Sequence, residues 1–119
     1  MLEIYLVRHG QDEGNAKGIL NGKNDSDLTN FGILQTKQLV NKIKGNLDLK
    51  FDKIYTSPLQ RTHITANIIA KSLHIPDVLI NNDLVEREFG SMAGKKTSDI
   101  KKLCNPNIFK TDVCTYFTK

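Results

Sequence analysis

Apolar, β-branched and aromatic residues gather at three places along the chain and predict three strands. The first run, Ile4 to Val7, contains no polar residue. Such a run is typical of a strand buried on both faces of a parallel sheet, so we expect it to be a central strand. The segments 51–57 (FDKIYTS) and 77–81 (DVLIN) predict two further strands.

Between and after these segments the apolar positions recur at helical spacing. Residues 29–44 predict a helix with Thr29 as its N-cap. A short helix is predicted at about 97–103, and residues 10–27, rich in glycine and asparagine, predict a long loop. The expected apolar stripe of the first helix consists of Phe31, Leu34, Leu39, Val40 and Ile43.

Another helix is predicted to begin where three start signals coincide. Ser57 is a suitable N-cap, Pro58 fits the first helical position, and Gln60 occupies the capping-box position. The helix is expected to run to about Leu73. Arg61 lies in its first turn, so a strand end, a helix N-terminus and an arginine would converge on a place suited to an anion. The alternative is an ordinary solvent-exposed arginine.

A fixed cation and a titratable side chain directly follow the first predicted strand. In open α/β sheets ligands bind beyond the carboxyl ends of the strands, which is where Arg8, His9 and Gly10 lie. A histidine at a strand end is more often a packing residue, so these three residues do not decide the matter alone. Asn15 could donate an amide hydrogen bond to a phosphate oxygen or simply form a turn.

A second charged group, Glu86 and Arg87, follows the third predicted strand. The pair could be a general acid beside a substrate-binding arginine, or a solvated ion pair. Of the seventeen lysines and arginines only Arg8, Arg61 and Arg87 are arginines. Each of these arginines lies in a segment that could form a binding or catalytic site. This placement favours roles that need the bidentate guanidinium fork.

Composition excludes several classes of protein. The 119 residues fit one small domain. The net charge is +4, but the lysines are scattered without interleaved aromatics, so we expect a small anionic substrate rather than a nucleic acid. The chain shows no basic leader and no membrane-length apolar run, which predicts a cytoplasmic protein without a membrane partner. Cys104 and Cys114 lack metal-ligand spacing, so reduced thiols and no metal are expected.

The order of these segments resembles the histidine phosphatase superfamily, also called phosphoglycerate mutase-like. The resemblance covers about residues 2–95 and rests on LVRHG, Asn15, LTNFGILQT, TSPLQRTHITA and LVEREFG. It implies an α/β fold: a three-layer α/β/α domain with a mostly parallel central sheet, occupying residues 1–119 as one domain. It also implies phosphate monoester hydrolysis through a phosphohistidine, a small phosphorylated substrate and no cofactor.

The resemblance also implies roles for particular residues. His9 would be the nucleophile that accepts the phosphoryl group, and Glu86 would protonate the leaving alkoxide and later deprotonate the attacking water. Arg8 and Arg61 would clamp the phosphoryl oxygens, and Asn15 would donate to them. Arg87 completes the set as a substrate contact.

The chain departs from the family pattern in its second half. Family members carry a second histidine in a Ser-His-Gly or Thr-His-Gly turn, and this sequence has no such turn. His63 lies two residues from Arg61, on a different face of the predicted helix, and His74 lies about 20 Å along its axis. We therefore expect an N-terminal portion of a longer domain, without the C-terminal strand, with little activity by itself. The open strand edge would invite association, so a homo-oligomer remains an option.

Two substitutions bear on the branch of the family. Gln11 replaces a frequent glutamate, and Gly14 stands where the mutases often carry tryptophan, which favours the phosphatase branch. The alternatives are a phosphoglycerate mutase and a catalytically silent remnant that binds phosphorylated ligands.

Overall fold

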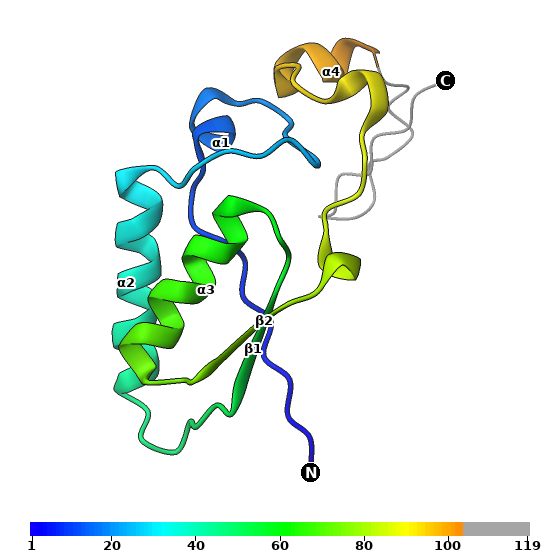
Figure 1. Cartoon of the computed structure of the whole chain (residues 1–119). Coiled ribbons are helices and arrows are strands. Elements are labelled where there is room, and N and C mark those ends of the chain that lie inside the picture. Colours follow the sequence, from blue (N-terminus) through cyan, green and yellow to red (C-terminus); the bar gives the residue numbers. More distant parts are fainter. Residues whose placement is uncertain (104–119) are drawn as a thin grey trace.

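A computed structural model describes residues 1–103 of the chain (Figure 1). Cys104, Cys114 and the last part of the predicted domain lie outside these described residues. Within residues 1–103, no helix is both long enough and apolar enough to cross a membrane. In chain order the elements are α1 (Glu13–Lys17), α2 (Asn30–Lys44), β1 (Lys53–Thr56), α3 (Gln60–Leu73), β2 (Asp77–Ile80), two 3-10 turns (Asn82–Leu84 and Gly90–Met92) and α4 (Thr97–Leu103).

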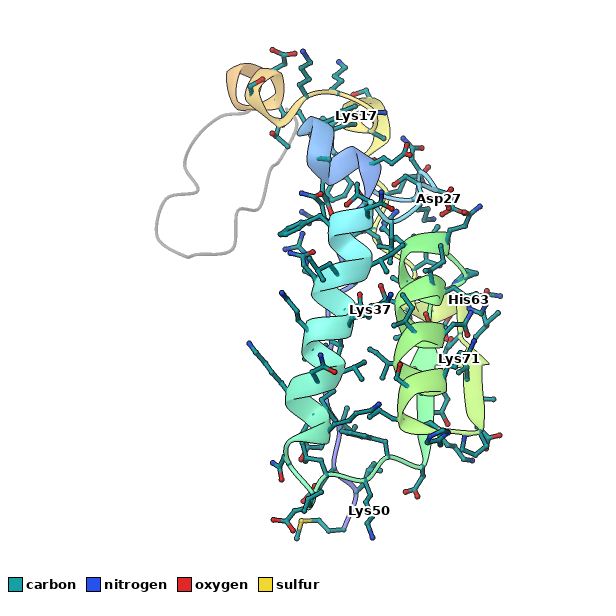
Figure 2. All side chains as sticks on the ribbon, turned by 90° about the vertical axis from the view of Figure 1, so that its left-hand side faces the viewer. Lys17, Asp27, Lys37, Lys50, His63 and Lys71 are labelled. Atoms are coloured by element: carbon teal, nitrogen blue, oxygen red, sulfur yellow. The ribbon has the colours of Figure 1, made fainter. Side chains whose placement is uncertain are left out.

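The two strands form a parallel pair joined by α3. Their register runs from Lys53 opposite Asp77 to Thr56 opposite Ile80. The helices α2 and α3 lie side by side and make one helical layer beside the strands (Figures 1 and 2). A strand, a crossover helix and a parallel strand are the unit from which α/β folds are built. The expected α/β class and both of these predicted strands are therefore confirmed.

The predicted central strand is wrong for this structure. Residues 4–7 belong to no strand, and Ile4 and Leu6 are 74% and 94% exposed. Within the described residues their backbone pairs with no other segment; the segment passes the two strands, where the ring of Tyr5 meets the ring of Phe51 edge to face at 5.2 Å. An apolar run gives strand propensity, but a strand also requires a ladder partner on a neighbouring segment.

The helix predicted at 29–44 is confirmed, including its cap. The Thr29 hydroxyl accepts a hydrogen bond from the Gly32 amide at 3.0 Å. The predicted stripe is only partly right, because Phe31 is 54% exposed. The buried residues of α2 are Gly32, Thr36 and Val40, which are spaced by four and share one face. Small residues on that face permit close approach of neighbouring backbone.

The start of the next helix differs from the prediction. Helix α3 begins at Gln60, and its N-cap residue makes no side-chain capping bond. The Ser57 hydroxyl instead pairs with the Thr62 hydroxyl at 2.5 Å. The Gln60 amide donates to a carboxylate oxygen of Asp25 at 2.7 Å. A residue from a distant loop therefore caps α3, which no local pattern could have indicated.

A small hydrophobic core lies outside the pair of helices α2 and α3. Met92 and Ile100 are buried there, with Leu20 and Phe89 packed against them. Antiparallel bridges join Ile19 to Lys96 and Asp12 to Leu28. The helix predicted at about 97–103 is present as α4. This core ties the segment after α1 to the segment before α4.

Candidate active site

The candidate nucleophile lies in the histidine turn, the irregular segment 8–11 that precedes α1. His9 is half-buried, and its Nδ1 lies 2.7 Å from the carbonyl oxygen of Gly10. A carbonyl can only accept, so Nδ1 carries the proton and donates. In the neutral ring this assignment places the lone pair on Nε2, which becomes the nucleophilic atom.

Two helices hold the backbone of this turn. The Gly10 amide donates to the Thr65 hydroxyl of α3 at 3.2 Å, and the Gln11 amide donates to the Gln35 side chain of α2 at 2.9 Å. A Cβ on Gly10 would lie 2.3 Å from the carbonyl oxygen of Gly32, so only glycine fits here. The turn is thus fixed between α2 and α3.

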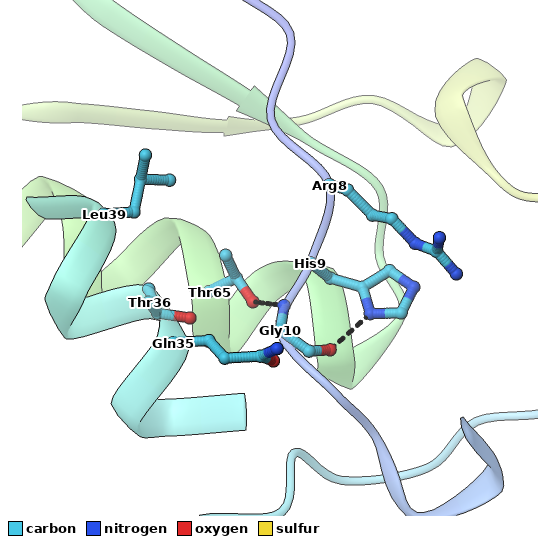
Figure 3. A pocket seen from close by; sticks show the side chains of 7 residues that line it. All are labelled: Arg8, His9, Gly10, Gln35, Thr36, Leu39 and Thr65. Atoms are coloured by element: carbon cyan, nitrogen blue, oxygen red, sulfur yellow. Dashed lines mark hydrogen bonds between the residues drawn. The ribbon is translucent and has the colours of Figure 1, made fainter. Parts of the chain in front are cut away.

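The side chains of Arg8 and His9 project to the same side of the turn, away from Thr36 and Leu39 of α2 (Figure 3). A hollow of about 190 Å³ lies between the turn and the two helices. Because neither Arg8 nor His9 points toward α2, we do not take the hollow as the anion site. Its lining residues are Arg8, His9, Gly10, Gln35, Thr36, Leu39 and Thr65.

Arg61 is buried rather than exposed, with only 3% of its surface accessible. Its Nε lies 3.5 Å from a carboxylate oxygen of Asp12. Its Nη1 donates to the Asn24 carbonyl at 2.8 Å, and its Nη2 donates to the Gly22 carbonyl at 2.6 Å. Within residues 1–103 no hydrogen bond joins this guanidinium to His9.

The backbone of Arg61 is nevertheless linked to the histidine turn. The Thr65 hydroxyl, which accepts from Gly10, donates to the Arg61 carbonyl at 2.8 Å. The first turns of α3 and the residues after His9 therefore share one hydrogen-bonding side chain. This link brings together two segments that the sequence separates by about fifty residues.

Asn15 lies in a helix that the sequence did not predict. The expected loop at 10–27 contains helix α1, capped by Asp12. The Asn15 amide donates to the Asp12 carboxylate at 2.6 Å, and the Asn15 side-chain oxygen accepts from the Asp12 amide at 3.3 Å. Asp12 is fully buried and was not predicted as a site residue. The spacing Asp-x-x-Asn, a capping-box variant, is the signal that could have found it.

Glu86 and Arg87 are exposed and lie in the irregular segment after the first 3-10 turn. Glu86 accepts a hydrogen bond from the Arg87 amide at 3.0 Å, and the Arg87 guanidinium lies 4.9 Å from the center of the Phe89 ring. In the described part of the chain neither makes a hydrogen bond or ion pair with His9 or Arg8.

In the described part of the chain, neither of the other two histidine side chains makes a hydrogen bond or ion pair with Arg8, His9 or Arg61. In Figure 2 His63 is on the side of α3 that faces away from α2. His74 ends α3 in the left-handed conformation, with φ of 56°. Residues 1–103 also contain no cluster of three or more His, Cys, Asp or Glu side chains that could hold a metal ion.

Comparisons with a family model and with known proteins indicate the same family for this chain. A family model described as "Histidine phosphatase superfamily (branch 1)" matches residues 4–112. "Putative phosphoserine phosphatase 2" of Hydrogenobacter thermophilus is 41% identical over 95 residues, which are 80% of this chain and 45% of that protein. A 2,3-bisphosphoglycerate-dependent phosphoglycerate mutase of Bartonella bacilliformis is 38% identical over 101 residues, 83% of this chain and 48% of that protein.

Solved structures give the same answer for the fold. A phosphoserine phosphatase from Entamoeba histolytica, solved with 3-phosphoglyceric acid, aligns with a TM-score of 0.65 and 36% identity. The alignment covers 78% of this chain and 44% of that chain. The chain spans about half the length of the relatives that it matches.

Proposed function

This chain belongs to the histidine phosphatase superfamily, and we propose that its site serves phosphate monoester hydrolysis through a phosphohistidine at His9. The main support for this proposal is the hydrogen bond from His9 Nδ1 to the Gly10 carbonyl, at 2.7 Å. It leaves Nε2 with the lone pair and fixes the ring on a turn held by two helices. A positioned, uncharged imidazole nitrogen is what nucleophilic attack on phosphorus requires.

The proposed reaction has two steps. In the first, His9 Nε2 forms a bond to phosphorus while the ester oxygen leaves, and Glu86 gives this oxygen a proton. In the second, Glu86 takes a proton from water, the water oxygen bonds to phosphorus, and the bond to Nε2 breaks. Splitting the transfer in this way replaces one difficult step by two easier ones.

Arginine side chains and an amide donor would bind the phosphoryl oxygens. Arg8 projects on the same side of the turn as His9, which supports a direct contact with the transferring group. Arg61, Asn15 and Arg87 are the further candidates for binding phosphate or substrate. Fixed cations stabilise the charge of a transferring phosphoryl group without a metal ion.

The substrate class that we propose is a small phosphate monoester. Support comes from relatives whose names specify phosphoserine phosphatase and phosphoglycerate mutase activity. A phosphoglycerate mutase is the second candidate, because the Bartonella relative carries that name. Incubation with 3-phosphoglycerate separates the two: a mutase gives 2-phosphoglycerate, whereas a phosphatase gives glycerate and inorganic phosphate.

Trapping the intermediate tests the chemistry directly. The 119-residue chain is mixed with a 32P-labelled monoester, quenched in alkali and assayed for acid-labile protein-bound phosphate. We expect label on the wild-type chain and none on His9→Ala, with His74→Ala as the matched control that keeps the label. Steady-state turnover by this chain is expected to be low. Binding of phosphate without any labelled His9 would contradict hydrolysis and favour a silent phosphate-binding protein.

A further inference from the structure

The carboxylate of Asp12 has three polar partners near the proposed site. It is completely buried, and a buried carboxylate is tolerated only with close partners. One oxygen accepts from the Asn15 amide at 2.6 Å. The other accepts from the Asn21 side chain at 2.9 Å and lies 3.5 Å from Arg61 Nε. One group therefore contacts three segments: α1, the following loop and α3.

These contacts determine how Arg61 is presented. A guanidinium has five N–H donors in a rigid fork. In Arg61 the Nε faces Asp12, one donor of Nη1 goes to Asn24, and one donor of Nη2 goes to Gly22. Within residues 1–103, one N–H on each Nη has no hydrogen-bond partner, and these two donors are the ones that could meet a ligand. Because the fork is planar, fixing three donors also fixes the direction of the other two.

The same residue determines how Asn15 is presented. In the reciprocal cap, the Asn15 side-chain oxygen faces the Asp12 amide at 3.3 Å. The side-chain nitrogen of Asn15 is consequently turned away, and it makes no hydrogen bond with residues 1–103. Asn15 is exposed, so its side-chain N–H groups can donate hydrogen bonds to an anion.

We propose that Asp12 is a positioning residue of the phosphate site, which orients the Arg61 guanidinium and the Asn15 amide with donors left for phosphate. This inference rests on the proposed function, because it assumes that both residues bind the phosphoryl group. Asp12 itself repels anions and does not contact the ligand. Its effect is transmitted through the two side chains that it holds.

Binding of inorganic phosphate to the 119-residue chain, measured by isothermal titration calorimetry, tests the inference. Asp12→Asn keeps the size of the side chain but removes the charge that pairs with Arg61. We expect it to weaken phosphate binding by about tenfold or more. Ser26→Ala is the matched control: it removes the other acceptor of the Asn21 amide, 3.1 Å away, without touching Arg61, and should leave the affinity unchanged.

A double-mutant cycle distinguishes positioning from simple loss of structure. If Asp12 acts through Arg61, adding Asp12→Asn to Arg61→Lys should weaken phosphate binding much less than it does in the wild type. Equal losses in both backgrounds would overturn the inference. If Asp12→Asn does not fold, Asn21→Ala removes one support of the carboxylate and should weaken binding several-fold. An unchanged affinity in that variant would also overturn it.

The outcomes separate the proposed phosphate site from the proposed role of Asp12. No phosphate binding by the wild-type chain would contradict the proposed phosphate site, and this inference with it. Phosphate binding that is equal in the wild type and Asp12→Asn would overturn the role of Asp12 alone.

Discussion

The Thr65 hydroxyl joins Gly10 to α3: it accepts a hydrogen bond from the Gly10 amide at 3.2 Å and donates to the Arg61 carbonyl. Replacing Thr65 by Val keeps the shape and leaves the buried Gly10 amide without its partner. An unpaired buried donor costs about 1–3 kcal/mol, so we expect the free energy of unfolding in urea to fall by that amount. Phosphate labelling of His9 should fall as well, because the turn loses its anchor.

Thr36→Val is the control for this change. Thr36 is also buried, but its hydroxyl donates to the Gly32 carbonyl, which already accepts within helix α2. Removing that hydroxyl leaves no backbone group unpaired, so the loss should be well below that of Thr65→Val. Equal losses of unfolding free energy in the two variants would show that the hydrogen bond between Gly10 and Thr65 does not contribute to stability more than an ordinary buried hydroxyl does.

Gly32 lies against the backbone that follows the histidine. A Cβ at this position would lie 2.1 Å from the Gln11 carbonyl oxygen, and backbone cannot swing aside as a flexible side chain can. We expect Gly32→Ala to destabilise the chain by about 1–3 kcal/mol in urea unfolding, despite the better helix propensity of alanine. Gly45→Ala is the control, because its nearest neighbouring atom would be 3.4 Å away; it should be neutral or slightly stabilising.

The cap on α3 by Asp25 can be tested separately from the site. Asp25→Ala removes the acceptor of the Gln60 amide and should cost about 1 kcal/mol of unfolding free energy, as loss of an N-cap does. Asp27→Ala changes the net charge equally, but its side chain makes no hydrogen bond or ion pair with residues 1–103. A loss as large in Asp27→Ala would mean that charge, and not capping, is responsible.

The exposure of residues 4–7 leads to a further stability prediction. Leu6 is 94% exposed, so Leu6→Lys should change the unfolding free energy of the 119-residue chain by less than about 0.5 kcal/mol. Val40→Ala, at a buried position of α2, should cost about 1–3 kcal/mol and calibrates the assay. A loss of several kcal/mol for Leu6→Lys would mean that this segment is a buried strand after all.

Elements with strong local signals were predictable from the sequence. Thr29 caps α2 through a contact three residues away, and the β-branched runs of β1 and β2 and the short helix α4 were placed within a few residues. The motif order around His9, Arg61 and Glu86 also indicated the family correctly. Caps and periodicity depend on neighbours within a few positions, and the sequence contains them directly.

The tertiary structure decided the contacts between segments that are distant in the sequence. The apolar run at 4–7 has strand propensity, yet its partner would have to come from another part of the chain. Arg61 was predicted to face an anion, but in the structure its guanidinium first satisfies Asp12 and two loop carbonyls. Burying a charge requires partners in three dimensions, and composition or spacing does not name them. The sequence by itself therefore determined the elements with strong local signals and the residue types of the proposed site, whereas only the fold decided which donors of Arg61 are already bonded to other residues.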